Sequence, residues 1–151
     1  MRRLDTHSGT ALTGLVTALV LCASAAYPGS SDQQALFTSK QASSGHDVYK
    51  KHCADCHGSD LMGDAGPALA GKKFADSLDY SGMTGKQLYD FIAKHMPKDD
   101  PGELTDKQYL QTFAYLLCKN GFKPGDSAID QKAIDAMDLQ PLPDSSQPSC
   151  D

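Results

Sequence analysis

One stretch of the chain, residues 85–95, spaces its apolar residues for one face of a helix. Thr84 stands directly before it and is a good N-cap. Pro97 follows closely and ends any helix that reaches it. The face is formed by residues at positions i, i+3, i+4 and i+7, which are Leu88, Phe91, Ile92 and His95. The pattern therefore predicts a one-sided helix that ends near His95.

A second helix of this kind is predicted over residues 105–121. Thr105 is its capping residue, Asp106 lies in its first turn, and the pair Asn120-Gly121 is a typical C-terminal stop. Its apolar stripe consists of four residues, which are Leu110, Phe113, Ala114 and Leu117.

The remaining pattern favours an all-α class. A further helix is expected from about Gly45 to Ala54. The segments between the helices are rich in Gly and Pro, as in residues 63–67, and no convincing strand pattern appears. Helices joined by such long loops need a central group around which the loops can fold.

The 151-residue length favours one domain, and shifts in composition divide the chain. Residues 27–43 are polar without an apolar period and predict a flexible lead-in. A compact domain is expected over residues 44–122. An acidic, proline-containing tail follows over residues 123–151, with one short helix expected over residues 127–137.

The first 26 residues have the three parts of a secretory signal peptide. Arg2 and Arg3 give a positive start, residues 11–21 are uncharged and mostly apolar, and residues 23–26 are small. We expect cleavage after Ala25 or Ala26, which makes residues 1–26 the signal peptide. The protein is then exported to the periplasm.

Two alternatives to cleavage stay open. An uncleaved membrane anchor is the first, because no charge interrupts residues 9–26, although this stretch is short for a span of about 20 apolar residues. A lipid anchor on Cys22 is the second. It is disfavoured because Leu21 stands where a lipoprotein signal has a small residue.

Export determines how the cysteines and the charge are interpreted. Four of the five cysteines remain after cleavage, in an oxidising compartment where unattached thiols tend to pair. The formal net charge of −5 becomes one unit more negative, which excludes a typical nucleic-acid-binding protein. An acidic protein could instead approach a basic docking face on a partner.

Residues 53–57 form the motif Cys-x-x-Cys-His, the attachment pattern of a covalent haem. Two thiols one helical turn apart can reach the two vinyl groups of a porphyrin edge, and the next residue, His57, then projects toward the iron. A thioredoxin-like dithiol is disfavoured because it needs a βαβ pattern. A zinc site is disfavoured because Cys118 and Cys150 do not form a second Cys-x-x-Cys.

Two adjacent residues, His95 and Met96, compete for the second axial position on the iron. Met96 precedes Pro97, where the helix must break and the chain can turn back. A thioether favours ferrous iron, whereas a second histidine would lower the potential. Met62 and Met83 are weaker candidates. The residues alone favour Met96 and leave His95 open.

The stretch from Gly45 to Gly121, about half of the chain, resembles a class I c-type cytochrome. It looks especially like the cytochrome subunits and domains that accompany bacterial quinoprotein alcohol dehydrogenases. The shared segments are residues 49–58 (YKKHCADCHG), 63–71 (GDAGPALAG), 95–97 (HMP), 101–106 (PGELTD) and 114–117 (AYLL).

The resemblance implies a role for particular residues. Met96 matches the distal sulfur ligand, and Pro67 matches the proline whose carbonyl accepts from the proximal imidazole. Leu69 matches an apolar residue that lines the haem pocket. Gly45 and Tyr49 match residues of the first helix that cross the last helix. The implied fold is the all-α class I cytochrome c fold around one haem c.

We therefore expect a periplasmic one-electron carrier rather than an enzyme, because filled axial positions leave no open iron site. The resemblance suggests a quinoprotein dehydrogenase as donor and a terminal oxidase or another cytochrome as acceptor. The acidic charge excludes nucleic acid from the expected partners. Three alternatives remain: a fixed subunit of a dehydrogenase complex, a haem enzyme or gas sensor with a labile sixth ligand, and a non-haem metal or thiol protein. Membrane association is expected only if the N-terminal segment stays uncleaved.

Cys118 and Cys150 are expected to form a disulfide that fastens the tail to the domain. The bond would close a loop of about 30 residues and stabilise the fold by about 3 kcal/mol in the chain-entropy model. The alternative is two unrelated thiols.

Overall fold

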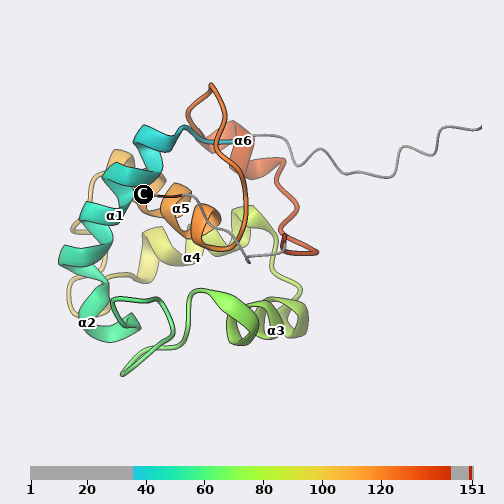
Figure 1. Ribbon diagram of the computed structural model, residues 1–151. Helices are drawn as coiled ribbons and strands as arrows, with labels where there is room; N and C mark the ends of the chain where they lie inside the picture. The colour runs from blue at the N-terminus through green and yellow to red at the C-terminus, as the bar shows by residue number, and fades with distance from the viewer. Residues whose placement is uncertain (1–35, 144–149, 151) are drawn as a thin grey trace, which may run out of the picture. The chain divides into compact units, whose positions relative to one another are not determined.

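The computed structural model describes residues 36–143 and residue 150. Across this part of the chain it contains helices and no strands, so the predicted all-α class is confirmed. The elements are α1 (Ser39–His52), α2 (Ala54–His57), α3 (Gly71–Ser81), α4 (Gly85–His95), α5 (Asp106–Lys119) and α6 (Gln131–Asp135) (Figure 1).

The two best-patterned helices form where their caps predict them. Thr84 caps α4 by accepting a hydrogen bond from the backbone N–H of Gln87, whose side chain accepts from the Thr84 N–H in return. Thr105 and Gln108 form the same reciprocal pair at α5. The predictions of both helices and of both N-caps are confirmed.

Helices α1 and α5 cross in close contact and form the frame of the domain (Figure 1). The approach requires glycine at position 45, because a Cβ there would overlap the backbone carbonyl of Gln111. Beside the crossing, Tyr49 of α1 lies against Tyr115 of α5, with ring centroids 5.4 Å apart. Helices α1 and α5 therefore position each other through direct backbone contact.

The predicted flexible lead-in over residues 27–43 is wrong for the part that the structure describes. Helix α1 begins at Ser39, and Thr38 caps it by accepting from the N–H of Gln41. Phe37 and Ala42 are fully buried. The segment is a helix in which few residues face the core, so its polar composition reflects its exposed face.

The prediction of a separate acidic tail after residue 122 is also wrong where the structure describes it. Gln41 exchanges two hydrogen bonds with the backbone of Ile129, and the N–H of Gly125 donates to the carbonyl of Phe37. Residues 123–143 form a C-terminal extension of the domain. Four of its apolar residues belong to the main core: Ile129, Ile134, Met137 and Leu139. The domain therefore extends beyond the predicted bounds of 44–122 on both sides.

Helix α3 was not predicted, and α6 is shorter than the stretch expected over residues 127–137. Helix α3 buries only Phe74 and Leu78, so few large apolar residues mark it in the sequence. It begins at Gly71, which has a φ of +72° and looks like a loop residue in the sequence.

The structure brings Cys118 and Cys150 together at a Cα–Cα distance of 5.8 Å, a separation at which a disulfide can form. Both side chains are buried. The pair would fasten the end of the extension to α5.

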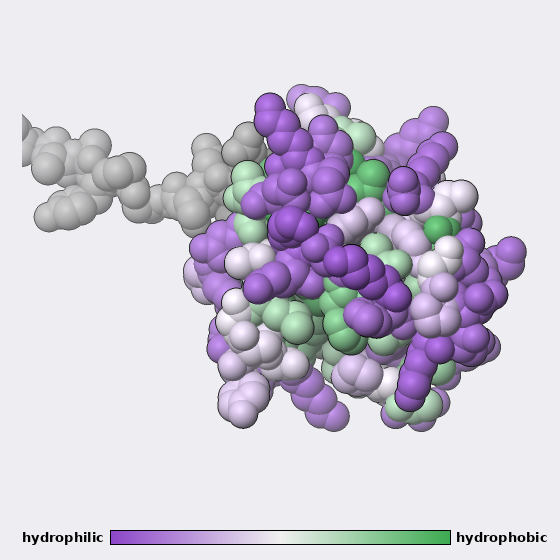
Figure 2. Space-filling view, turned by 180° about the vertical axis from the view of Figure 1, so that it is seen from behind, coloured by the Kyte–Doolittle hydropathy of each residue, from purple (hydrophilic) through white to green (hydrophobic). Residues whose placement is uncertain are grey.

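The predicted signal peptide, residues 1–26, lies outside the described residues. No helix among residues 36–143 is long and apolar enough to cross a membrane. The face in Figure 2 is largely hydrophilic, with a small apolar area near its centre.

Candidate functional site

The Cys-x-x-Cys-His motif forms a single helical turn at the end of α1. Cys53 ends α1 and precedes α2, which runs from Ala54 to His57. The N–H groups of Cys56 and His57 both donate to the carbonyl of Cys53, over 3.2 and 3.0 Å. Residues three apart in such a turn lie on the same side. The two thiols are free in the structure, with Cys53 half-buried and Cys56 exposed.

His57 is buried and has one ring nitrogen engaged. Its Nδ1 lies 2.8 Å from the backbone carbonyl of Pro67. A carbonyl can only accept, so Nδ1 carries the proton, and in the neutral imidazole Nε2 keeps a lone pair. An imidazole in this tautomer is suited to bind a metal through Nε2, with the carbonyl fixing the orientation of the ring.

Gly66 fits closely against the ring of His57. A Cβ at this position would lie 2.9 Å from Cε1 and 3.0 Å from Nδ1 of His57. The N–H of Gly66 also donates to the carbonyl of Cys56 over 2.7 Å. The loop that carries Pro67 is therefore tied to the motif and fills the space behind the ring.

Tyr49 holds the chain directly after the motif. Its hydroxyl donates to the carbonyl of Gly58 over 2.6 Å. Burial is the main cause that raises the pKa of Tyr49 well above its ordinary value, and nearby Cys53 adds to the shift. The hydroxyl therefore remains a donor at any physiological pH.

Burial also raises the pKa of the Cys53 thiol to about 11, with nearby Cys56 and Glu103 contributing in the same direction. Glu103 lies close because its carboxylate is 2.7 Å from Nδ1 of His52, at the end of α1. The loop between α4 and α5 thus touches the segment that leads into the motif.

The two candidates for the second axial position differ in their surroundings. His95 is exposed at the end of α4 and lies against the ring of Phe91, with centroids 5.0 Å apart. Met96 is the half-buried C-cap residue, and buried Pro97 follows it. The arrangement favours Met96, because its side chain is the one partly enclosed by the protein.

A small apolar cluster surrounds the motif. Leu69 and Ile92 are packed against it together with Cys53. Leu69 is fixed through its backbone, since its N–H donates to Leu61 and its carbonyl accepts from the side chain of Asn120. The buried members of the cluster are Tyr49, Leu61, Ala70, Tyr115 and Leu116. The structure therefore joins the motif, Leu69 and the end of α4 in one region.

The residues present fit a covalent haem. Two thiols stand one helical turn apart, an imidazole is oriented with Nε2 available, and a thioether follows the end of α4. The apolar cluster offers the surroundings that a porphyrin requires. No group of three or more His, Cys, Asp or Glu residues that could hold a metal ion occurs in the part of the chain that the structure describes.

Three contacts of this region were missed in the sequence. They are Tyr49 to Gly58, Tyr109 to Met96, and His52 to Glu103. The first two have a backbone carbonyl as acceptor, which every residue offers, and the third joins two side chains that lie 51 positions apart.

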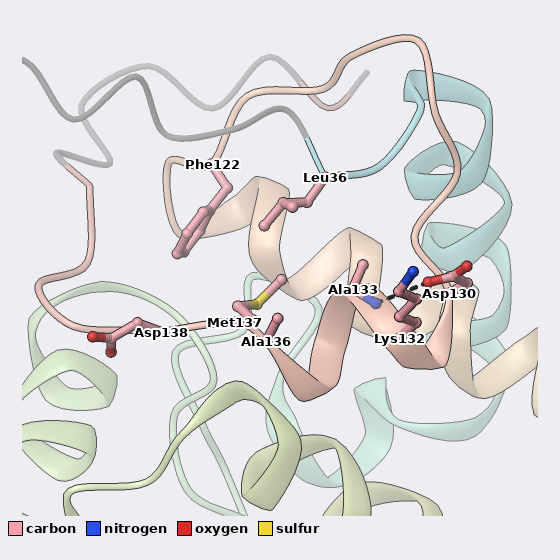
Figure 3. A pocket seen from close by; sticks show the side chains of 8 residues that line it. All are labelled: Leu36, Phe122, Asp130, Lys132, Ala133, Ala136, Met137 and Asp138. Atoms are coloured by element: carbon pink, nitrogen blue, oxygen red, sulfur yellow. Dashed lines mark hydrogen bonds between the residues drawn. The ribbon is translucent and has the colours of Figure 1, made fainter.

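A hollow of about 460 Å³ lies away from these residues, between Leu36, which precedes α1, and the C-terminal extension. Figure 3 shows Leu36 and Phe122 facing Met137 across it, with Lys132 and Asp138 near its ends. None of the predicted site residues lines it. The hollow is therefore separate from the motif.

Comparison with known proteins gives one family. Residues 40–116, about half of the chain, match the family model described as "Cytochrome C oxidase, cbb3-type, subunit III". The matched range contains the motif, Pro67, Leu69 and Met96, and it ends before the C-terminal extension. No curated protein and no solved structure matches the chain.

Proposed function

Because this chain belongs to the family of cbb3-type cytochrome c oxidase subunit III, whose cytochrome c domain binds haem c covalently and transfers electrons, we propose that it is a mono-haem electron carrier of the periplasm. The fold is the all-α fold of a class I cytochrome c, and the cofactor is one covalently bound haem c with its iron. We further propose which residues hold the haem, in which compartment the protein acts and which partners it has.

The proposed attachment site is Cys53 and Cys56, with His57 as the proximal ligand. The observation that carries it is the 2.8 Å contact between Nδ1 of His57 and the carbonyl of Pro67. This contact leaves Nε2 as the free nitrogen and holds the ring in one orientation. Both thiols of the same helical turn are free to form thioether bonds.

Met96 is the proposed sixth ligand. It is half-buried, whereas His95 is exposed and lies against Phe91. A neutral thioether stabilises ferrous iron and raises the reduction potential. Leu69 belongs to the apolar cluster beside the motif and is the proposed lining residue.

The haem supplies one-electron chemistry, with iron alternating between the ferric and ferrous states. The protein contributes the fixed imidazole, the sulfur of Met96 and an apolar enclosure that limits water. If His57 and Met96 both bind the iron, no position would remain there for a substrate, so a carrier is favoured over an enzyme or a gas sensor.

The proposed donor is a dehydrogenase, such as a quinoprotein alcohol dehydrogenase, and the proposed acceptor is a terminal oxidase or another cytochrome. The net charge of −5, one unit more negative after cleavage of the signal peptide, suits a partner with a basic docking face. A second function has one specific support: the family description names an oxidase subunit. The chain could then be a fixed subunit of a larger complex rather than a mobile carrier.

Expression of the full chain in a bacterium with an intact haem-attachment system tests the proposal. We expect a coloured protein in the periplasmic fraction that retains haem after denaturation and titrates as a one-electron couple. Haem lost on denaturation would contradict the attachment site. Recovery only with membranes or with large partner subunits in the native host would favour the fixed-subunit alternative.

A further inference from the structure

The backbone of Met96 is held from two sides. Its N–H donates to the carbonyl of Ile92 over 3.0 Å, which is the last hydrogen bond of α4. Its carbonyl accepts from the hydroxyl of Tyr109 over 2.6 Å. With both polar groups of the residue engaged, the Met96 side chain leaves the backbone in a fixed direction.

Tyr109 is itself firmly placed. It is 4% exposed and belongs to the main core, together with Phe113 and Leu104. Its N–H donates to the carbonyl of Thr105, so it lies in the capped first turn of α5. The hydroxyl is thus anchored on the helix that crosses α1.

The chain after Met96 has few other attachments. Residues 98–103 are exposed, and the next buried side chain is Leu104. Glu103 is tied to His52, near the far end of the loop. The hydrogen bond from Tyr109 therefore fixes the backbone at Met96 itself, directly before buried Pro97 and the exposed loop.

The opposite side of the site uses a similar contact. Tyr49 donates to the carbonyl of Gly58, directly after His57, over the same distance of 2.6 Å. Tyr49 lies on α1 and Tyr109 on α5, the two helices that cross at Gly45. A tyrosine hydroxyl from each helix thus ties the chain at one of the proposed axial ligands.

We propose that Tyr109 is a positioning residue that holds the sulfur of Met96 on the haem iron through the Met96 carbonyl. The inference rests on the proposed function, in which Met96 is the sixth ligand. In this role Tyr109 strengthens the bond between Met96 and the iron, and this effect is separate from the packing of its ring in the core.

The test is Tyr109→Phe in the haem-loaded full chain, with carbon monoxide binding to the reduced protein as the readout. Carbon monoxide can bind only when Met96 leaves the iron, so the rate reports the open fraction. Loss of one buried hydrogen bond should raise this rate about fivefold. The ring of Tyr109 stays in the variant, so the packing of α5 is kept.

Tyr89→Phe is the matched control. Tyr89 is a buried tyrosine of α4 in edge contact with Phe113, and its hydroxyl makes no hydrogen bond within the described part of the chain. We expect its carbon monoxide rate to equal that of the wild type. Thermal unfolding of both variants is measured alongside, so that a general loss of stability is separated from a loosened ligand.

The outcomes distinguish a failure of the positioning role of Tyr109 from a failure of the proposed function. A raised rate in Tyr109→Phe with an unchanged rate in Tyr89→Phe supports the positioning role. Equal rates in Tyr109→Phe and wild type, or the same rise in both variants, overturn it and leave the electron carrier intact. A wild type that holds covalent haem but lacks the near-infrared band of methionine-bound ferric haem also overturns it. A chain without covalent haem overturns the proposed function as well.

Discussion

Substitution of Gly66 by alanine perturbs the proximal side of the site at one atom. The added Cβ would lie 2.9 Å from Cε1 and 3.0 Å from Nδ1 of the His57 ring. Ordinary contacts between carbon atoms are about 3.5–4.0 Å. Either the ring or the segment that carries Pro67 must therefore move by about 0.5–1 Å.

This displacement is large enough to break the contact that orients His57. The distance from Nδ1 to the Pro67 carbonyl is 2.8 Å, and hydrogen bonds of this type extend to about 3.2 Å. Overpacking costs about 1–3 kcal/mol, and the lost hydrogen bond adds about 0.5–1.5 kcal/mol. We expect Gly66→Ala to lower the free energy of unfolding by about 2–4 kcal/mol.

The substitution should also change the reduction potential. Donation from Nδ1 makes the imidazole a stronger ligand and stabilises ferric iron, so its loss raises the potential. If the whole energy of the hydrogen bond acts on one oxidation state, the increase is up to about 60 mV. Equilibrium redox titration measures the shift, and urea unfolding measures the stability.

Gly82→Ala is the control for Gly66→Ala. Gly82 has a φ of +63° and nothing within 4 Å of an added Cβ. Alanine in this left-handed conformation costs about 1–2 kcal/mol without touching His57. The control should lose stability and keep its potential. A potential that is unchanged in Gly66→Ala, or that shifts equally in Gly82→Ala, would refute the geometry described for the proximal side.

Two further predictions concern the frame of the fold. Gly45→Ala places a Cβ on the carbonyl of Gln111, so it should lower the free energy of unfolding by about 3 kcal/mol or more, whereas a loss under about 1 kcal/mol in urea unfolding would contradict the close crossing. The double variant Cys118→Ala, Cys150→Ala opens a loop with a sequence separation of 32 and should cost about 3–4 kcal/mol while the visible spectrum stays unchanged. Free thiols at Cys118 or Cys150 in the wild type, detected by mass spectrometry after alkylation, would contradict the pairing.

The parts of the fold that sequence reasoning predicted have their cause within a few residues. The reciprocal caps at Thr84 and Thr105 lie three residues from their partners, and the apolar stripes of α4 and α5 follow directly. The attachment motif is equally local, since one helical turn brings Cys53 and Cys56 together. Such features can be recognised without knowledge of the tertiary structure.

The parts that were missed depend on tertiary contacts that no local pattern in the sequence reveals. Gln41 bonds Ile129 across 88 positions, and this contact converts both an expected lead-in and an expected tail into parts of the domain. The amino-acid composition does not reveal this contact, because the polar residues around Gln41 cover the outer face of α1. The bond from Tyr109 to Met96 spans only 13 positions, yet its acceptor is a backbone carbonyl that every residue has.

The absorption spectra of purified wild type and Met96→Ala, oxidised and reduced, show whether the protein carries haem c with Met96 as its sixth ligand. We expect a c-type spectrum in both and the near-infrared band of methionine-bound ferric haem in the wild type only. His95→Ala, the control at the neighbouring exposed residue, should keep the band. A band that survives in Met96→Ala or disappears in His95→Ala would contradict the ligand assignment, and a wild type without covalent haem would contradict the proposed electron-carrier function.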